Sequence, residues 1–304
     1  MIHGTHNSEF DERNASVKIF INGKFYKREE AKISVFDSGY LVGDGIWEAF
    51  RLYKGKLIFA NEHLNRLWDG AKYIDLNIPF TKAEIINMVN DTIRENRMYS
   101  DCHIRLMITR GIKMTPSQDP RFTISEPNIV IIAEHKKVSS KSKIKGIKLF
   151  TSTVRRGAPD YLDPRLNCHS KIHEVQALIQ AIKAGADEAL MLDINGFVST
   201  CNSTNFFIVK NNEIWTSTGK YCMNGITRKK VIEICQHKNI PCILKDFSLF
   251  DVYNAEEAFV TGSFGGITPI REIDGRIIGN GKFGELSHKI NNFYLELIEK
   301  ELLL

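Results

Sequence analysis

Residues 163–175 concentrate the side chains of this chain that are best suited to catalysis. Lys171 stands between His169 and His173, which lie four positions apart. A lysine amine can attack a carbonyl carbon or act as an acid and base, and two imidazoles at this spacing could relay protons or bind a metal. The sequence signals no third histidine or carboxylate ligand beside them. We therefore expect no metal site.

The elements that must position this segment divide into two parts, each mixing strands with helices. We expect a polar arm at residues 1–16, a small α+β domain at 17–135, a Ser/Lys-rich linker at 136–146, and a larger domain at 147–304. Apolar spacing predicts helices over 61–76, 81–97, 170–184 and 227–237, with a capping box at Thr81 and Glu84. The dipeptides Asn22-Gly23 and Asp274-Gly275 predict hairpin turns. Strands and helices do not alternate strictly, which favours an α+β fold.

Composition limits the classes of partner. The chain has 304 residues, a net charge of +5 and no basic stripe, so we expect no nucleic acid partner. The Lys-rich stretch at 135–145 is typical of a solvated linker. None of the six cysteines forms a C-x-x-C pair, the N-terminus lacks an apolar signal segment, and no apolar run reaches the roughly 18 residues of a membrane span. These features predict a cytoplasmic protein with no membrane contact.

Several short segments in one order resemble the class IV aminotransferases over residues 17 to about 295. The resemblance implies the two-domain fold-type IV architecture, pyridoxal 5'-phosphate (PLP) as cofactor, and a homodimer. The matching segments are Asp37-Ser38-Gly39-Tyr40 with Gly43-Asp44-Gly45, Glu62-His63-Leu64-Asn65-Arg66-Leu67, Thr109-Arg110-Gly111, Ala186-Asp187-Glu188-Ala189, Asn195-Gly196, Asn224-Gly225-Ile226-Thr227-Arg228, and Thr261-Gly262-Ser263 through Ile267-Thr268-Pro269.

The resemblance assigns four residues to the cofactor phosphate. Arg66 matches an arginine that pairs with the phosphate, a role that suits a guanidinium fork; the other interpretation is an ordinary surface arginine on a helix. Ile226 and Thr227 open a helix after a glycine, where free backbone N–H groups bind anions. Ser263 matches a hydroxyl residue near the same phosphate, in a Gly-rich stretch that could also be a plain turn.

Other positions matched to the family concern the substrate. Trp47 matches an aromatic residue that faces the substrate, although aromatic residues at such positions also serve as core. Phe264 and Gly265 are matched to the substrate side in the same way. Arg110 is either structural or near the substrate. The carboxylate-holding arginine of D-amino acid aminotransferases is missing; Lys113 could replace it, or the substrate could lack that carboxylate.

The first departure from the family falls on its cofactor-bonding lysine. The family segment Arg-Leu-Lys-x-Leu-Asn aligns without a gap and places Asn167 on the lysine, and an amide cannot form a Schiff base. Lys171 lies four residues later, one helical turn away if the helix already runs there, so its amine could reach the cofactor. The alternative is a solvated or phosphate-pairing lysine at the start of the helix.

The second departure concerns the pyridine ring. The family places a glutamate against the ring nitrogen, which keeps that nitrogen protonated. Here Thr200 takes the place of the glutamate. A hydroxyl could donate to an unprotonated nitrogen but could not hold the pyridinium.

Three functions remain open on these grounds. The leading one is a PLP-dependent enzyme that exchanges an amino group between an amino acid or amine and a 2-oxo acid. The second keeps the fold but changes the chemistry, as a lyase, racemase or PLP-independent enzyme with Lys171, His169 or His173 as base. The third is a protein that binds PLP or another phosphorylated ligand without catalysis.

Overall fold

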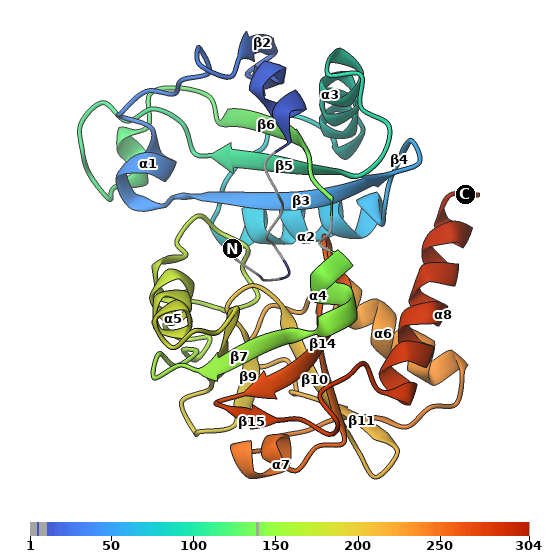
Figure 1. Cartoon of the computed structure of the whole chain (residues 1–304). Helices are drawn as coiled ribbons and strands as arrows, with labels where there is room; N and C mark the ends of the chain where they lie inside the picture. The colour runs from blue at the N-terminus through green and yellow to red at the C-terminus, as the bar shows by residue number, and fades with distance from the viewer. Residues whose placement is uncertain (1–4, 6–10, 138–139, 304) are drawn as a thin grey trace. The chain divides into compact units, whose positions relative to one another are not determined.

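A computed structural model describes residue 5, residues 11–137 and residues 140–303 of the chain. By its internal contacts the chain forms two compact units (Figure 1). The smaller unit comprises Glu9–Lys137 together with Leu166–Lys171, and the larger unit comprises Met1–Ser8, Val138–Arg165 and Ile172–Leu304. The segment 166–171 therefore belongs to the smaller unit, whereas the sequence-based boundary placed it in the second domain.

The smaller unit is built on one antiparallel sheet of six strands, in the order β2-β1-β6-β5-β3-β4. Its elements are η1 (Glu12–Ser16), β1 (Lys18–Ile21), β2 (Lys24–Lys27), α1 (Ser38–Val42), β3 (Gly45–Tyr53), β4 (Lys56–Leu57), α2 (Ala60–Tyr73), α3 (Lys82–Glu95), β5 (Cys102–Thr109), η2 (Pro120–Phe122) and β6 (Asn128–His135).

Burial alternates along the central strands of this sheet. From Ile46 on, the even-numbered residues of β3, such as Phe50 and Leu52, are buried, and the odd-numbered ones are half-buried. Successive side chains of a strand point to opposite faces. Helices α2 and α3 contact β3, β1 and β6, and they cover the buried face. The predicted capping box of Thr81 and Glu84 is confirmed at the start of α3. The opposite face of the sheet carries a cavity described below.

The larger unit contains a mixed sheet of nine strands. Its strand order is β12-β11-β10-β13-β14-β7-β8-β9, and β15 pairs with β14. The elements are α4 (Ser140–Lys145), β7 (Ile147–Thr151), α5 (Ile172–Lys183), β8 (Glu188–Leu192), β9 (Val198–Cys201), β10 (Asn205–Lys210), β11 (Glu213–Thr216), α6 (Ile226–His237), β12 (Cys242–Leu244), α7 (Leu249–Tyr253), β13 (Glu257–Gly262), β14 (Gly266–Ile273), β15 (Arg276–Ile277) and α8 (Glu285–Glu301).

Both faces of the larger sheet are covered. Ala177 and Ala181 of α5 pack on Ala189 and Met191 of β8. The intervening β8 residues belong to a separate apolar cluster that includes Val252 of α7. Helices α6 and α8 contact each other and β13. Among the described residues, no helix is long and apolar enough to cross a membrane.

Two local predictions differ from the structure. Residues 140–145 of the predicted linker form helix α4, while residues 138–139 lie outside the described part of the chain. The predicted helix over 170–184 begins only at Ile172. The second difference bears directly on the site, because it removes residues 170 and 171 from the helix.

Candidate functional site

Residues 167–169 run alongside β3 in the smaller unit and form an isolated β-bridge with it. The backbone N–H of Trp47 donates to the carbonyl of Asn167 over 3.0 Å, and the N–H of His169 donates to the carbonyl of Gly45 over 3.0 Å. Cys168 lies opposite Ile46 in this antiparallel pairing. Asn167 is therefore held by the edge of β3, through main-chain bonds that do not depend on its side chain.

The Asn167 side chain is buried, with 6% of its surface exposed. Its Nδ2 donates to the backbone carbonyl of Trp47 over 2.7 Å. Its Oδ1 is buried and accepts no hydrogen bond from any described residue. The position that the resemblance gives to the lysine thus holds an amide with one committed donor and one open acceptor.

Lys171 does not lie on a helix with Asn167. Helix α5 begins at Ile172, and residues 169–171 are non-helical. Four residues of extended chain span about 13 Å, compared with about 6 Å along a helix. The premise of one helical turn is wrong, because the pairing of 167–169 with β3 keeps this stretch extended. The assignment of Lys171 as the amine that bonds the cofactor stays a prediction, without the geometry that suggested it.

The two histidines fall in different units. His173 is the second residue of α5, and its Nε2 lies 3.2 Å from Oε2 of Glu174 and 3.1 Å from Nη1 of Arg156. His169 lies next to the bridge residue Cys168, where burial lowers the pKa of its imidazole despite the nearby carboxylate of Asp37. Its Nε2 is buried and has no partner among the described residues. Over the same residues, the structure contains no group of three metal-ligating side chains.

Arg66 on α2 is held by a buried carboxylate. Its Nε and Nη2 donate to the two oxygens of Glu48 over 2.6 and 2.8 Å, and Nδ1 of His63 lies 2.6 Å from the same carboxylate. Burial raises the pKa of Glu48, but the charge of Arg66 and the bonds from His63 and Arg66 lower it to about 2. Only 19% of the Arg66 side chain is exposed, so the surface-arginine interpretation is wrong. Its Nη1 is buried and finds no acceptor in the described chain.

Trp47 lies on the face of the sheet opposite α2 and α3. Its indole Nε1 donates to the carbonyl of Cys168 over 2.9 Å, which adds a side-chain bond to the main-chain pairing of residues 167–169 with β3. The guanidinium of Arg105 lies 4.1 Å from the centre of its ring. This half-buried ring is not part of the core, but its contact with a substrate stays a prediction.

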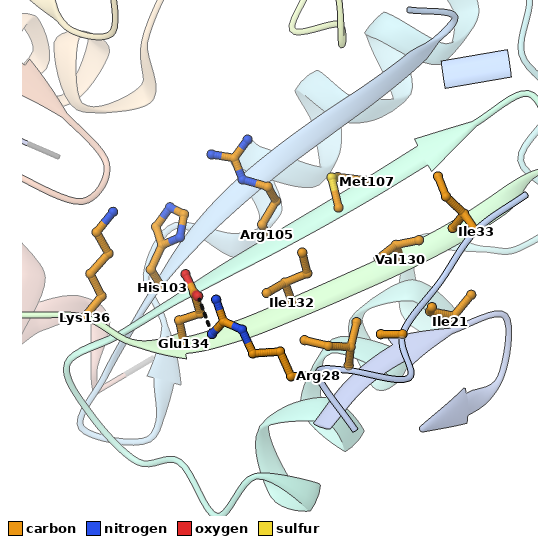
Figure 2. A pocket seen from close by; sticks show the side chains of 12 residues that line it. Ile21, Arg28, Ile33, His103, Arg105, Met107, Val130, Ile132, Glu134 and Lys136 are labelled. Carbon is orange, nitrogen blue, oxygen red and sulfur yellow. Dashed lines mark hydrogen bonds and ion pairs between the residues drawn. The ribbon is translucent and has the colours of Figure 1, made fainter. Parts of the chain in front are cut away.

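The same face carries a cavity of about 440 Å³, which the sequence analysis did not find (Figure 2). Arg105, His103 and Lys136 point into it, and the ion pair of Arg28 with Glu134, 3.5 Å long, closes one side. Burial lowers the pKa of both Arg105 and Lys136. The excess of cationic groups suits an anionic ligand. In the sequence, only the alternate positions 103, 105 and 107 indicated that these side chains share one face of a strand. Alternation does not reveal whether that face of the sheet is covered or open.

In the larger unit, α6 begins without a side-chain cap. Its N-cap, Gly225, supplies no side-chain hydrogen bond, and the first backbone N–H groups of a helix have no acceptor within the helix, which suits an anion. A Cβ at Gly225 would lie 2.2 Å from Oδ1 of Asn205, whose Nδ2 in turn holds the carbonyl of Met223. The hydroxyl of Thr227 is buried and lacks a partner in the part of the chain described. Ile226 and Thr227 thus have the local geometry that anion binding needs.

Ser263, Phe264 and Gly265 form the turn between β13 and β14. Lys143 of α4 donates to the carbonyls of Gly265 and Ile267, and this holds the turn. Phe264 is buried, with 3% of its surface exposed. The roles of Ser263 towards phosphate, and of Phe264 and Gly265 towards substrate, stay predictions.

Thr200 is not available as a donor to a ring nitrogen. Its hydroxyl donates to the carbonyl of Thr204 over 2.7 Å and lies 3.4 Å from Nδ2 of Asn205. A hydroxyl has a single hydrogen to donate. The expectation that Thr200 could donate to the pyridine is therefore wrong for this arrangement.

Arg110 and Lys113 are structural. Arg110 holds both oxygens of Asp44 over 2.6 and 3.1 Å and donates to the carbonyls of Ile74 and Asp75 after α2. Lys113 is buried, and its amine donates to the carbonyl of Asp119. Neither cation is free to replace the carboxylate-holding arginine.

The two-unit α+β fold and the open donors of Arg66 and Thr227 agree with the fold-type IV PLP enzymes, and similarity to known proteins supports this class. The family model described as amino-transferase class IV matches residues 45–273, and the chain belongs to that family. A putative branched-chain-amino-acid aminotransferase of Methanocaldococcus jannaschii is 38% identical over 93% of this chain and 97% of its own length. Branched-chain-amino-acid aminotransferase-like protein 2 of Arabidopsis thaliana is 37% identical over 94% of this chain, which spans about half of that relative's length.

Solved structures share the fold. A branched-chain amino acid aminotransferase of T.th., solved with pyridoxamine 5'-phosphate, superposes with a TM-score of 0.85 at 27% identity. The alignment covers 94% of this chain and 95% of that one. The predicted family and fold class are confirmed.

The residues of this chain fit one end of the family cofactor and not the other. In the smaller unit the unpartnered Nη1 of Arg66 suits an anion such as a phosphate, and in the larger unit so does the unpartnered hydroxyl of Thr227. The amide of Asn167 offers no amine to an aldehyde, and the Thr200 hydroxyl is committed to Thr204. These residues therefore fit the phosphate of the cofactor, but they provide neither a lysine to bond its aldehyde nor a carboxylate to pair with its pyridinium nitrogen.

Proposed function

We propose that this chain is an aminotransferase-like enzyme that binds PLP and exchanges an amino group between an amino acid or amine and a 2-oxo acid. The observation that carries the proposal is the pair of buried donors without acceptors at positions that the resemblance assigns to phosphate, Nη1 of Arg66 and Oγ1 of Thr227. An unpartnered buried donor costs about 1–3 kcal/mol, so its presence at these two positions favours a bound anion.

Four residues of this chain would help to bind the cofactor phosphate or would move a proton. Glu48 orients Arg66 so that its remaining nitrogen binds phosphate, and Thr227 adds a hydroxyl donor. The cofactor, when bound, supplies an electron-withdrawing ring that acidifies the carbon bearing the amino group. His169 is neutral at pH 7, because its pKa is lowered, and its open Nε2 can accept a proton. His169 acts as the base, because Asn167 stands where the family has its lysine.

The cavity on the sheet face supports a carboxylate substrate. Arg105 and Lys136 contribute positive charge to its lining. The ring of Trp47 lies beside the guanidinium of Arg105. Amino acids and 2-oxo acids both carry a carboxylate, which matches the cationic side chains, and a side chain, which an aromatic ring such as that of Trp47 can contact. The particular substrate is left to be identified by assay.

The direct test of the phosphate contacts compares PLP with pyridoxal, which lacks the phosphate. Titration calorimetry of the wild-type protein should give an affinity for PLP at least 100-fold above that for pyridoxal, since two or more charge-assisted hydrogen bonds are lost. Equal affinities would contradict the assignment of Arg66 and Thr227 to phosphate.

One observation favours a second candidate, the same fold with altered chemistry. An amide at the lysine position, together with a committed Thr200 hydroxyl, removes two groups on which ordinary amino transfer depends. The names of the relatives favour amino transfer instead. If PLP binds but no amino group moves, a lyase or racemase assay with the same amino acids is the next measurement.

Two further proposals concern the setting of the enzyme. We propose a homodimer, as the family resemblance implies, and a cytoplasmic location, which the free thiols of the six cysteines support. Sedimentation of the purified protein tests the first. A monomer at concentrations above those used for assay would contradict it.

A further inference from the structure

The orientation of the Asn167 amide is fixed by its neighbour. Nδ2 lies 2.7 Å from the carbonyl oxygen of Trp47, a group that can only accept. Turning the amide over would bring two oxygens to that distance, so Nδ2 must face Trp47 and Oδ1 must face away. The main-chain bonds of residues 167 and 169 to β3 hold the backbone in place as well. The open acceptor is therefore a built feature of the smaller unit.

An acceptor with no donor is costly in a buried position. Asn167 is 94% buried by its exposed fraction of 6%, and no described residue donates to Oδ1. A leucine, which has the same branching, would avoid the cost of an unpaired polar group. The amide is better explained if a ligand donates a hydrogen bond to Oδ1.

The same part of the unit holds an open donor. Leu166, next to Asn167, packs on Gly70 of α2, where a Cβ would lie 3.3 Å from its Cδ1. Gly70 follows Arg66 by one helical turn, and Nη1 of Arg66 lacks an acceptor in the described chain. A ligand that satisfies both atoms carries an anionic group and a hydrogen-bond donor.

We propose that this chain binds the amine form of the cofactor, pyridoxamine 5'-phosphate, without a covalent bond and in preference to the aldehyde form, with the 4'-amine donating to Oδ1 of Asn167. The inference rests on the proposed function, because the phosphate contacts come from there. The resemblance places Asn167 where the family has the lysine that bonds the 4'-carbon, so the group on that carbon faces this side chain. An amine there is a donor, whereas the aldehyde oxygen is an acceptor and opposes Oδ1.

The test uses three phosphate esters that differ only at the 4'-carbon: pyridoxamine 5'-phosphate, 4'-deoxypyridoxine 5'-phosphate and PLP. Titration calorimetry of the wild-type chain should show the amine form binding at least roughly 10-fold more tightly than each of the others, the effect of one buried hydrogen bond to a charged group. Asn167→Leu should bring the amine and deoxy forms to within about twofold of each other. Asn65→Ala, which removes an exposed amide from α2, is the matched control and should keep the full preference.

The outcomes separate the two proposals. If the amine and deoxy esters bind the wild-type chain equally, the role of Asn167 is wrong while the phosphate contacts stand. If none of the three esters binds, the proposed function itself fails. Borohydride treatment with PLP, followed by peptide mapping, should leave Lys171 unmodified. A modified Lys171 would restore the lysine assignment and overturn noncovalent binding. The wild-type comparison decides the inference even if Asn167→Leu does not fold.

Discussion

Glu48 binds Arg66 through two hydrogen bonds and leaves the third nitrogen of the guanidinium, Nη1, without a partner. The carboxylate is fully buried, while the arginine keeps a fifth of its side chain exposed. A buried charge pair of this kind contributes little net stability, but it sets the direction of the arginine because both oxygens are engaged. Glu48 thus orients Arg66 so that its Nη1 can bind a second anion.

Replacing Glu48 by glutamine should destabilise the protein by about 3 kcal/mol, because the Arg66 charge is left without its counter-ion. Urea unfolding of Glu48→Gln against the wild type measures this loss. Asp91→Asn breaks the exposed pair with Arg94 on α3 and is the control, with an expected loss under about 1 kcal/mol. Equal losses in the two variants would show that the burial of Glu48 has no special role.

The contribution of Glu48 to the free energy of unfolding should depend on pH. Its pKa is lowered from 4.5 to about 2 in the folded protein, so the folded state favours the charged form. This contribution, on the order of 3 kcal/mol, is complete above the unfolded value and is lost as the pH falls from about 5 towards 2. The gap in unfolding free energy between wild type and Glu48→Gln should therefore narrow over that range. A gap that stays constant down to about pH 2.5 would argue against the lowered pKa.

Thr227→Val should weaken binding of the cofactor phosphate by roughly 10-fold, since it removes one hydroxyl bond to a charged group. Thermal stability without ligand should hardly change, because the hydroxyl has no partner in the described structure. Gln236→Ala, an exposed change on the same helix, serves as control. An unchanged affinity for PLP in Thr227→Val would remove this residue from the site.

His169→Gln should reduce amino transfer by about 100-fold or more, the usual contribution of a general base, while cofactor binding stays within a few-fold. In the wild type the rate should rise with pH through a midpoint below the ordinary histidine value of 6.5, because burial lowers the pKa of His169. The exposed His237 on α6 provides the control, His237→Gln, which should leave the rate unchanged. A pH profile that is the same in wild type and His169→Gln would exclude His169 as the base.

Local chemistry could be predicted from the sequence. Asn22-Gly23 and Asp274-Gly275 both adopt positive φ at each of their two residues, which is the geometry these side chains tolerate and short hairpin turns require. The capping box at Thr81 and Glu84 was likewise confirmed, because its partners lie three residues apart.

Contacts between distant parts of the chain could not be predicted. Asn167 pairs with Trp47, which lies 120 positions earlier, and this pairing keeps residues 167–169 extended. The apolar spacing after Ser170 suggested a helix that starts too early, and the inference about Lys171 depended on it. The hydroxyl of Thr200 donates to the backbone carbonyl of Thr204. This bond depends on the conformation of the backbone, which residue types alone do not reveal.

The central claim is that this chain moves amino groups on a cofactor held by its phosphate, and one measurement addresses it directly. The wild-type protein is incubated with ¹⁵N-labelled amino acids, a set of unlabelled 2-oxo acids and pyridoxamine 5'-phosphate or PLP, and the products are analysed by mass spectrometry. The account predicts new ¹⁵N-amino acids that form only with added cofactor and form more slowly in Thr227→Val. Tight cofactor binding with no ¹⁵N in any product would contradict amino transfer.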